Sequence, residues 1–144
     1  MKTLIIFDSN FGNTKIIAET IAKELDAKAI SVSDFNIKKF EGVDLFIVGS
    51  PIIGWKPTEK IIKFLTSLTT DHLKEVKIAT FDTRIKLFIH GNAAKKISNW
   101  LKKLGAKTII EPQGFFVKSM RGPLFEEEIK KATMWAKTIK SKYE

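Results

Sequence analysis

The chain has 144 residues, 44% of them hydrophobic and 28% charged, with a net charge of +9, and this balance is typical of one ordinary globular domain spanning residues 1–144. Cysteine is absent, which excludes disulfide frameworks, thiolate metal sites, iron–sulfur clusters and cysteine nucleophiles, so redox chemistry would require a bound cofactor. No segment approaches the roughly 20 apolar residues of a membrane span and no leader pattern opens the chain, so we expect a cytoplasmic protein without membrane insertion.

The first part of the chain alternates β-branched runs with a segment of helical period, which predicts βαβ units around a parallel sheet. The opening run is apolar nearly throughout, as expected for a central strand that helices cover on both faces. From Thr14, apolar residues recur at intervals of three and four, which predicts a helix. The strands expected here are Lys2–Phe7, Lys28–Val32 and Val43–Gly49.

The second part continues the same alternation. Pro57 suits the first position of a helix, because its missing N–H costs nothing there, and this helix is expected to end near Thr70. A later helix carries Trp100 in its apolar stripe and ends at Gly105, which acts as a C-terminal cap. The glutamates at 126–128 complement the dipole of the last helix. The strands expected here are Val76–Phe81 and Lys107–Ile110, with a resumption at Phe115–Val117.

Five strands alternating with helices predict a doubly wound, five-stranded parallel sheet in a three-layer α/β/α arrangement. In such a sheet, ligands bind outside the carboxyl ends of the strands. The loops that follow the first, third and fourth strands therefore decide the function. The segment Ser119-Met120-Arg121 can face the same edge.

The first of these loops joins a buried strand directly to a helix start and suits an anion. Its hydroxyl and amide groups are hydrogen-bond donors, its glycine lets the backbone turn, and the helix dipole adds partial positive charge. The alternative is a simple helix cap, since Asn and Thr are favoured there anyway. The loop lacks the spacing of a nucleoside-triphosphate P-loop or a dinucleotide fingerprint. The candidate phosphate ligands are Ser9, Asn10, Phe11, Gly12, Asn13 and Thr14.

The other two loops carry candidates for a flat aromatic ligand. An apolar run with a tryptophan follows the third strand, where a buried core has just ended, and it can lie against a ring; the alternative is that Trp55 folds back over its own helix. The loop after the fourth strand can supply the other wall, or it can serve only turn chemistry and local packing. The candidates are Ser50, Pro51, Ile52, Ile53, Gly54 and Trp55 in one loop and Asp82, Thr83, Arg84 and Phe88 in the other.

The remaining aromatic and histidine residues suggest no further site. His72 and His90 lie in different segments without metal-ligand spacing, so no metal is expected. Trp100 and Trp135 fit or border the apolar stripes of their helices, and both are expected to have structural roles.

Taken together, the three loops resemble the flavodoxin family in its short-chain form. Residues 9–14 resemble the family's Ser/Thr-x-Thr-Gly-x-Thr phosphate loop, with the final Gly-x-Thr intact, and Phe81-Asp82-Thr83-Arg84 resembles a version found in flavodoxin-like proteins of prokaryotes. The resemblance implies a flavodoxin-like fold and one FMN, with its phosphate in the first loop and its ring between the other two. It implies electron transfer at the exposed ring edge, and Gly54 matches the family's reorienting glycine peptide beside flavin N5.

Two features depart from that family. The third loop lacks a tyrosine to stack on the flavin, and the chain is basic where flavodoxins are typically acidic. The lysines are spread over every predicted helix rather than clustered with arginine, so nucleic acid is not expected as a partner. The positive charge instead favours acidic redox partner proteins.

Three classes of function stay open from the sequence. The leading one is an FMN-binding electron carrier. The alternative is an FMN-dependent oxidoreductase on the same fold, in which Arg84 and Lys86 bind a quinone or protoporphyrinogen-type substrate. The third is a flavin-free scaffold that binds nucleic acid or a regulator through its basic face.

Overall fold

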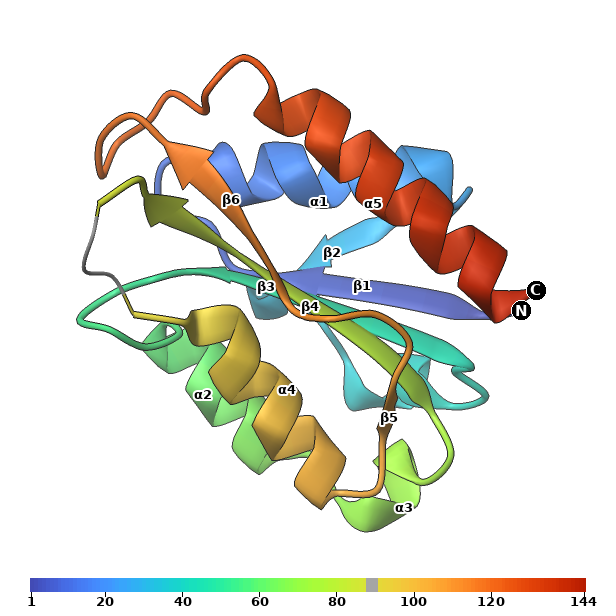
Figure 1. Ribbon diagram of the computed structural model, residues 1–144. Coiled ribbons are helices and arrows are strands. Elements are labelled where there is room, and N and C mark those ends of the chain that lie inside the picture. Colours follow the sequence, from blue (N-terminus) through green and yellow to red (C-terminus); the bar gives the residue numbers. More distant parts are fainter. Residues whose placement is uncertain (88–90) are drawn as a thin grey trace.

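A parallel β-sheet forms the middle layer of the structure, and helices cover both of its faces (Figure 1). The computed structural model describes residues 1–87 and 91–144. The strands follow the order β2-β1-β3-β4-β5, with β6 also paired to β4, and every pairing between them is parallel. This confirms the predicted doubly wound parallel sheet. The strands are β1 (Thr3–Phe7), β2 (Ala29–Ser31), β3 (Leu45–Pro51), β4 (Lys77–Ile85), β5 (Lys107–Thr108) and β6 (Gln113–Val117).

The segments β5 and β6 together fill the fifth strand position of the sheet. β5 pairs with the beginning of β4, where Lys77 lies opposite Lys107. β6 pairs with the end of β4, from Phe81 opposite Gln113 to Ile85 opposite Val117. The predicted resumption of the last strand is therefore correct, and the strand is interrupted between its two halves.

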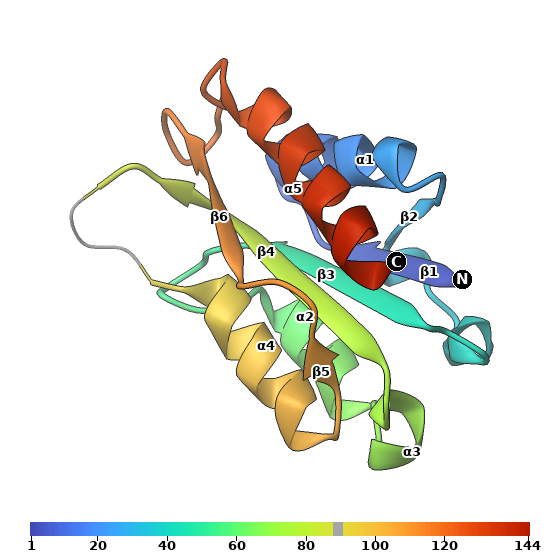
Figure 2. The ribbon, with the colours of Figure 1, turned by 45° about the vertical axis from the view of Figure 1, so that its right-hand side comes forward.

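Two pairs of helices sandwich the sheet, and the views in Figures 1 and 2 place α1 and α5 on one face and α2 and α4 on the other. α1 packs against α5, and α4 packs against β3 and β4. Two short 3₁₀ helices at Val32–Asp34 and Ile37–Phe40 connect β2 to β3. The α-helices are α1 (Asn13–Glu24), α2 (Glu59–Thr66), α3 (Thr70–Leu73), α4 (Ala93–Lys103) and α5 (Glu128–Tyr143).

The alternation of side chains along β1 divides the core into two clusters. Leu4 and Ile6 pack with residues of α2 and α4, whereas Ile5 and Phe7 pack with residues of α1 and α5. Successive side chains of a strand point to opposite faces, so an apolar run buried on both sides is the natural sequence of a central strand. The core therefore confirms the reading of Lys2–Phe7 as a strand covered on both faces.

Four local predictions need correction. β4 continues to Ile85 rather than ending at Phe81, because β6 offers it a partner. Thr58 rather than Pro57 begins the second helix: its Oγ1 accepts a hydrogen bond from the N–H of Ile61 at 3.3 Å. That helix ends at Thr66, and the separate α3 follows. Trp100 is 37% exposed and lies outside the core, whereas Trp135 is buried as expected.

The glutamate at the start of α5 has a different role from the predicted one. Glu128 is 1% exposed, and its Oε1 accepts a hydrogen bond from the N–H of Phe116 in β6 at 2.6 Å. Lys131 pairs with the same oxygen at 3.1 Å, and the N–H of Phe125 donates to the carbonyl of Phe116 at 3.2 Å. Glu128 thus satisfies a backbone donor at the outer edge of β6, which would otherwise present unpaired groups.

Replacing Glu128 by alanine should therefore destabilise the protein. The N–H of Phe116 would lose its acceptor in a partly buried position, at a cost of about 1–3 kcal/mol. Urea unfolding of Glu128→Ala should show this loss, whereas Glu126→Ala, at an exposed position of the same acidic run, should stay within about 0.5 kcal/mol of wild type. Equal effects of both substitutions would mean that only the helix dipole is involved.

Candidate functional site

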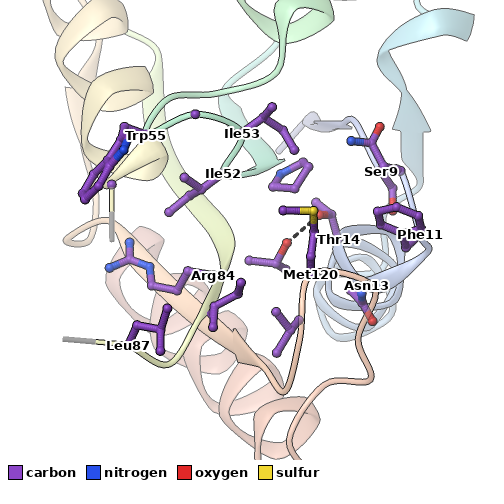
Figure 3. A pocket seen from close by; sticks show the side chains of 17 residues that line it. Ser9, Phe11, Asn13, Thr14, Ile52, Ile53, Trp55, Arg84, Leu87 and Met120 are labelled. Carbon is purple, nitrogen blue, oxygen red and sulfur yellow. Dashed lines mark hydrogen bonds between the residues drawn. The ribbon is translucent and has the colours of Figure 1, made fainter. Parts of the chain in front are cut away.

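A cavity of about 210 Å³ lies at the carboxyl edge of the sheet, where the loops after β1, β3 and β4 meet (Figure 3). Twelve of its lining residues belong to the predicted set: Ser9, Asn10, Phe11, Asn13, Thr14, Pro51, Ile52, Ile53, Gly54, Trp55, Thr83 and Arg84. Ile85, Leu87, Gly91, Val117 and Met120 also line it.

Among the described residues, three members of the predicted set do not line this cavity: Gly12, Ser50 and Asp82. Gly12 lies within the first loop as the N-cap residue directly before α1, with a positive φ of 93° that suits glycine. Ser50 and Asp82 are fully buried; the Ser50 hydroxyl accepts a hydrogen bond from the N–H of Thr58 at 3.1 Å and so holds the start of α2. Phe88 lies outside the described residues.

In the first loop, Ser9 organises the turn into α1. Its Oγ accepts hydrogen bonds from the N–H groups of Gly12 at 3.1 Å and Lys15 at 3.3 Å. The capping oxygen therefore comes from Ser9 rather than from the Asn or Thr residues that the alternative considered. A serine hydroxyl that accepts hydrogen bonds keeps one proton to donate. The first N–H groups of a helix also lack partners within it. Capping and anion binding are therefore compatible in this loop.

Thr14 joins the first loop to the third. Its buried Oγ1 lies 2.8 Å from Oγ1 of Thr83 on β4, so one hydroxyl of this pair donates to the other. The predicted donor Thr14 therefore bridges two of the three loops. At the tip of the first loop, the ring of Phe11 is exposed and lines the cavity; it stands where the phosphate-loop motif quoted above has its second threonine.

The second loop forms a tight hairpin. The N–H of Ile53 donates to the carbonyl of Lys56 at 2.8 Å, and the N–H of Lys56 donates back at 3.2 Å. Gly54 and Trp55 between them both have positive φ, 55° and 73°, the pattern of a type I′ turn. Positive φ is uncommon for a residue with a side chain, so the tertiary structure must hold Trp55 in this conformation.

Two contacts hold the backbone of Trp55 in place, one from α4 and one from the segment that precedes it. Lys96 donates from Nζ to the carbonyl oxygen of Trp55 at 3.0 Å. The backbone of Gly91 lies so close that a Cβ added there would come within 2.4 Å of the same oxygen. The indole remains 55% exposed at the rim of the cavity, so it does not fold back over its own helix.

The third loop is built on a buried ion pair rather than on an exposed polar pair. The carboxylate of Asp82 accepts two hydrogen bonds from Arg84, both at 2.7 Å, and one from the N–H of Ala94 at 2.9 Å. Arg84 also donates to Oδ1 of Asn92 at 3.2 Å. The prediction that Asp82 faces a ligand is therefore wrong. Because β4 continues, Asp82 is a residue of the sheet, and its buried carboxylate faces the start of α4.

Arg84 brings the positive end of this ion pair to the cavity. Gly114 of β6 makes room for it, since a Cβ there would lie 2.2 Å from the Nε atom. Arg84 lines the cavity, while its partner Asp82 does not. Among the described lining residues Arg84 is the only ionisable one, so the wall near Trp55 and Leu87 is apolar apart from one paired cation (Figure 3).

Two residues of the cavity wall, Val117 and Gly91, come from segments in which the sequence alone indicated no site. Val117 ends β6, and Gly91 precedes α4; neither carries a polar group that marks it as a ligand. The described residues include no cluster of His, Cys, Asp or Glu that could hold a metal ion. In the same part of the chain, no helix is long and apolar enough to cross a membrane.

Comparison with known proteins identifies relatives along most of the chain. Residues 4–119 match a family model described as a flavodoxin domain. An uncharacterized protein of Methanocaldococcus jannaschii is 31% identical over an alignment 152 residues long, gaps included. The alignment covers 96% of this chain and 98% of that protein. The structure is similar to that of a flavodoxin from the domain Archaea, with a TM-score of 0.83, 18% identity and full coverage of both chains. It is also similar to oxidised flavodoxin 1 from Bacillus cereus, with a TM-score of 0.82, 20% identity and 98% coverage of each chain.

The Asp82–Arg84 pair generates a prediction about stability. Asp82→Asn should cost about 3–5 kcal/mol, because it leaves the Arg84 charge without its buried partner. The double variant Asp82→Asn with Arg84→Gln should lose less than the sum of the two single variants, because neither charge is left behind. Urea unfolding of the four proteins measures this coupling. Strict additivity would contradict the assignment of a coupled pair.

Proposed function

Because the chain belongs to the flavodoxin family and its cofactor is FMN, we propose that it carries electrons between protein partners rather than converting a substrate of its own. Bound FMN supplies reversible uptake and release of electrons. The residues of the cavity fit this cofactor, because hydroxyl and amide groups lie at one end and apolar side chains at the other. A ligand with a phosphate and a flat ring needs this combination.

In this proposal the first loop holds the phosphate and the other two loops hold the ring. Ser9, Asn13 and the first N–H groups of α1 donate to the phosphate, aided by the helix dipole. The hairpin at Ile53–Lys56 and the end of β4 with Leu87 form the two walls of the ring site. The conformation of Trp55, held by Lys96, positions the indole where it can cover one edge of the ring.

The observation that carries the proposal is the small cavity with an exposed apolar rim. Its volume of about 210 Å³ lies below the roughly 300–1,000 Å³ of pockets that enclose a drug-sized ligand. Phe11, Trp55, Leu87 and Met120 all line the cavity and are all exposed. A cofactor in such a site leaves an edge uncovered, and the rim provides apolar surface that a protein partner can contact.

The alternative of an oxidoreductase acting on an anionic quinone or protoporphyrinogen-type substrate depends mainly on Arg84. Arg84 lines the cavity, but Asp82 already binds its guanidinium in a bidentate pair. This pairing favours the carrier, because it leaves the charge of Arg84 already neutralised.

The charge around the rim indicates acidic partners. Lys56 and Lys86 are exposed next to the lining residues Trp55 and Leu87, and Lys96 contacts the Trp55 carbonyl. The whole chain carries +9. A cationic rim around the electron-transfer edge speeds encounter with negatively charged proteins, and salt screens this effect.

Titration with FMN tests the proposed cofactor site. Wild type should quench FMN fluorescence with micromolar or tighter affinity, and Trp55→Ala should weaken binding roughly tenfold through loss of ring contact. Trp100→Ala is the matched control, because it removes another exposed tryptophan that lies outside the cavity wall. Failure of wild type to bind FMN would overturn the proposed function, and equal effects of both variants would overturn the role of Trp55.

Ionic strength tests the proposed partners. Electron transfer from the FMN-loaded protein to an acidic redox protein should slow steeply as salt rises, because screening removes the attraction. Transfer to a basic redox protein of similar potential should be slow at low salt and should speed up. Stopped-flow absorbance measures both rates, with a neutral small oxidant as the control. A rate to the acidic protein that ignores salt would contradict the prediction.

A further inference from the structure

An arginine from a distant segment lies over the ring at the tip of the first loop. The Cζ atom of Arg121 is 5.7 Å from the centroid of the Phe11 ring, within the range of a cation–π contact. Phe11 lines the cavity at the end formed by the first loop, whereas Arg121 belongs to the connection between β6 and α5. The contact brings a positive charge next to the cavity.

The connection that carries Arg121 is a closed turn packed on the first loop. The N–H of Gly122 donates to the carbonyl of Ser119 at 2.9 Å, and the Ser119 hydroxyl donates to the carbonyl of Gly122 at 2.7 Å. A Cβ on Gly122 would come within 2.6 Å of Oδ1 of Asn13, and Met120 lines the cavity. Both chain neighbours of Arg121 therefore touch the cavity wall or the loop that forms it.

Among the first-loop residues that line the cavity, Phe11 is the one whose side chain offers no hydrogen-bond donor to an anion. Its neighbours in the cavity wall, including Ser9, Asn10 and Asn13, all carry donors. An exposed aromatic ring in such a loop can still contribute to anion binding if its face holds a cation near the anion. The contact between Phe11 and Arg121 has this arrangement.

The charge balance of the first loop also calls for a cation. The carboxylate of Asp8 is 7% exposed, and its Oδ1 accepts a hydrogen bond from the N–H of Ser9 at 3.0 Å. A carboxylate beside the loop disfavours a phosphate dianion, because like charges repel. A guanidinium at the same loop offsets this repulsion and can donate charge-assisted hydrogen bonds to phosphate oxygens.

We infer that Arg121, positioned by the ring of Phe11, binds the phosphate of FMN and makes this protein select phosphorylated flavin over riboflavin. The inference rests on the proposed function, since it assigns a specificity residue to the same site. Arg121 acts on the phosphate and not on the ring, so its removal affects the binding of FMN and leaves the binding of riboflavin unchanged.

Fluorescence titrations with FMN and with riboflavin test the inference on wild type and Arg121→Gln. Arg121→Gln should weaken FMN binding by about tenfold, the usual scale of one charge-assisted hydrogen bond, and leave riboflavin binding unchanged. The salt dependence of FMN binding should also decrease. Lys102→Gln, which removes the same charge from an exposed position in the last turn of α4, is the control and should leave FMN affinity within twofold of wild type.

A second variant tests the positioning by the ring. Phe11→Leu keeps apolar bulk but removes the aromatic face, so it should weaken FMN binding, and adding Arg121→Gln to it should have less than the tenfold effect seen in wild type. Circular dichroism establishes that each variant is folded. Equal loss of FMN and riboflavin affinity in Arg121→Gln, no loss at all, or the same loss in Lys102→Gln would overturn the inference. If wild type binds neither flavin, the proposed function itself fails.

Discussion

The parallel pairing of β4 with β3 on one side and β6 on the other is the constraint on which the site depends. It aligns the carboxyl ends of three strands at one edge, so that the loops after β1, β3 and β4 meet there. It also carries β4 four residues beyond Phe81, which makes Asp82 a sheet residue and brings Arg84 to the cavity. The chemistry of the site thus follows from backbone pairing between strands that lie far apart in the sequence.

Polar contacts between elements then hold the loops in position. Asp82 ties β4 to the start of α4 through the N–H of Ala94, and Lys96 of the same helix holds the hairpin at Trp55. The Thr14–Thr83 hydroxyl pair joins the first loop to β4. The apolar part of the cavity wall offers few hydrogen bonds of its own, so such contacts between elements give it rigidity.

Several features were predictable because their information is local. The strand at Thr3–Phe7 and the turn into α1 need only an apolar run followed by capping and loop residues. The first loop is one continuous segment, so its candidates Ser9, Asn13 and Thr14 could be named together. Boundaries were harder: Thr58 begins α2 because its hydroxyl reaches the N–H of Ile61, whereas Pro57 satisfied the pattern equally well.

By itself, the sequence determined the parallel α/β architecture, the edge of the sheet at which a ligand is expected and the donors of the first loop, because periodicity and turn chemistry act over a few residues. Only the tertiary structure decided which side chains reach the cavity. Asp82 turned inward, Val117 and Gly91 joined the wall, and Arg121 came to lie over Phe11, 110 positions away in the chain. Such placements depend on strand pairing and helix docking between distant segments, and no local pattern encodes them.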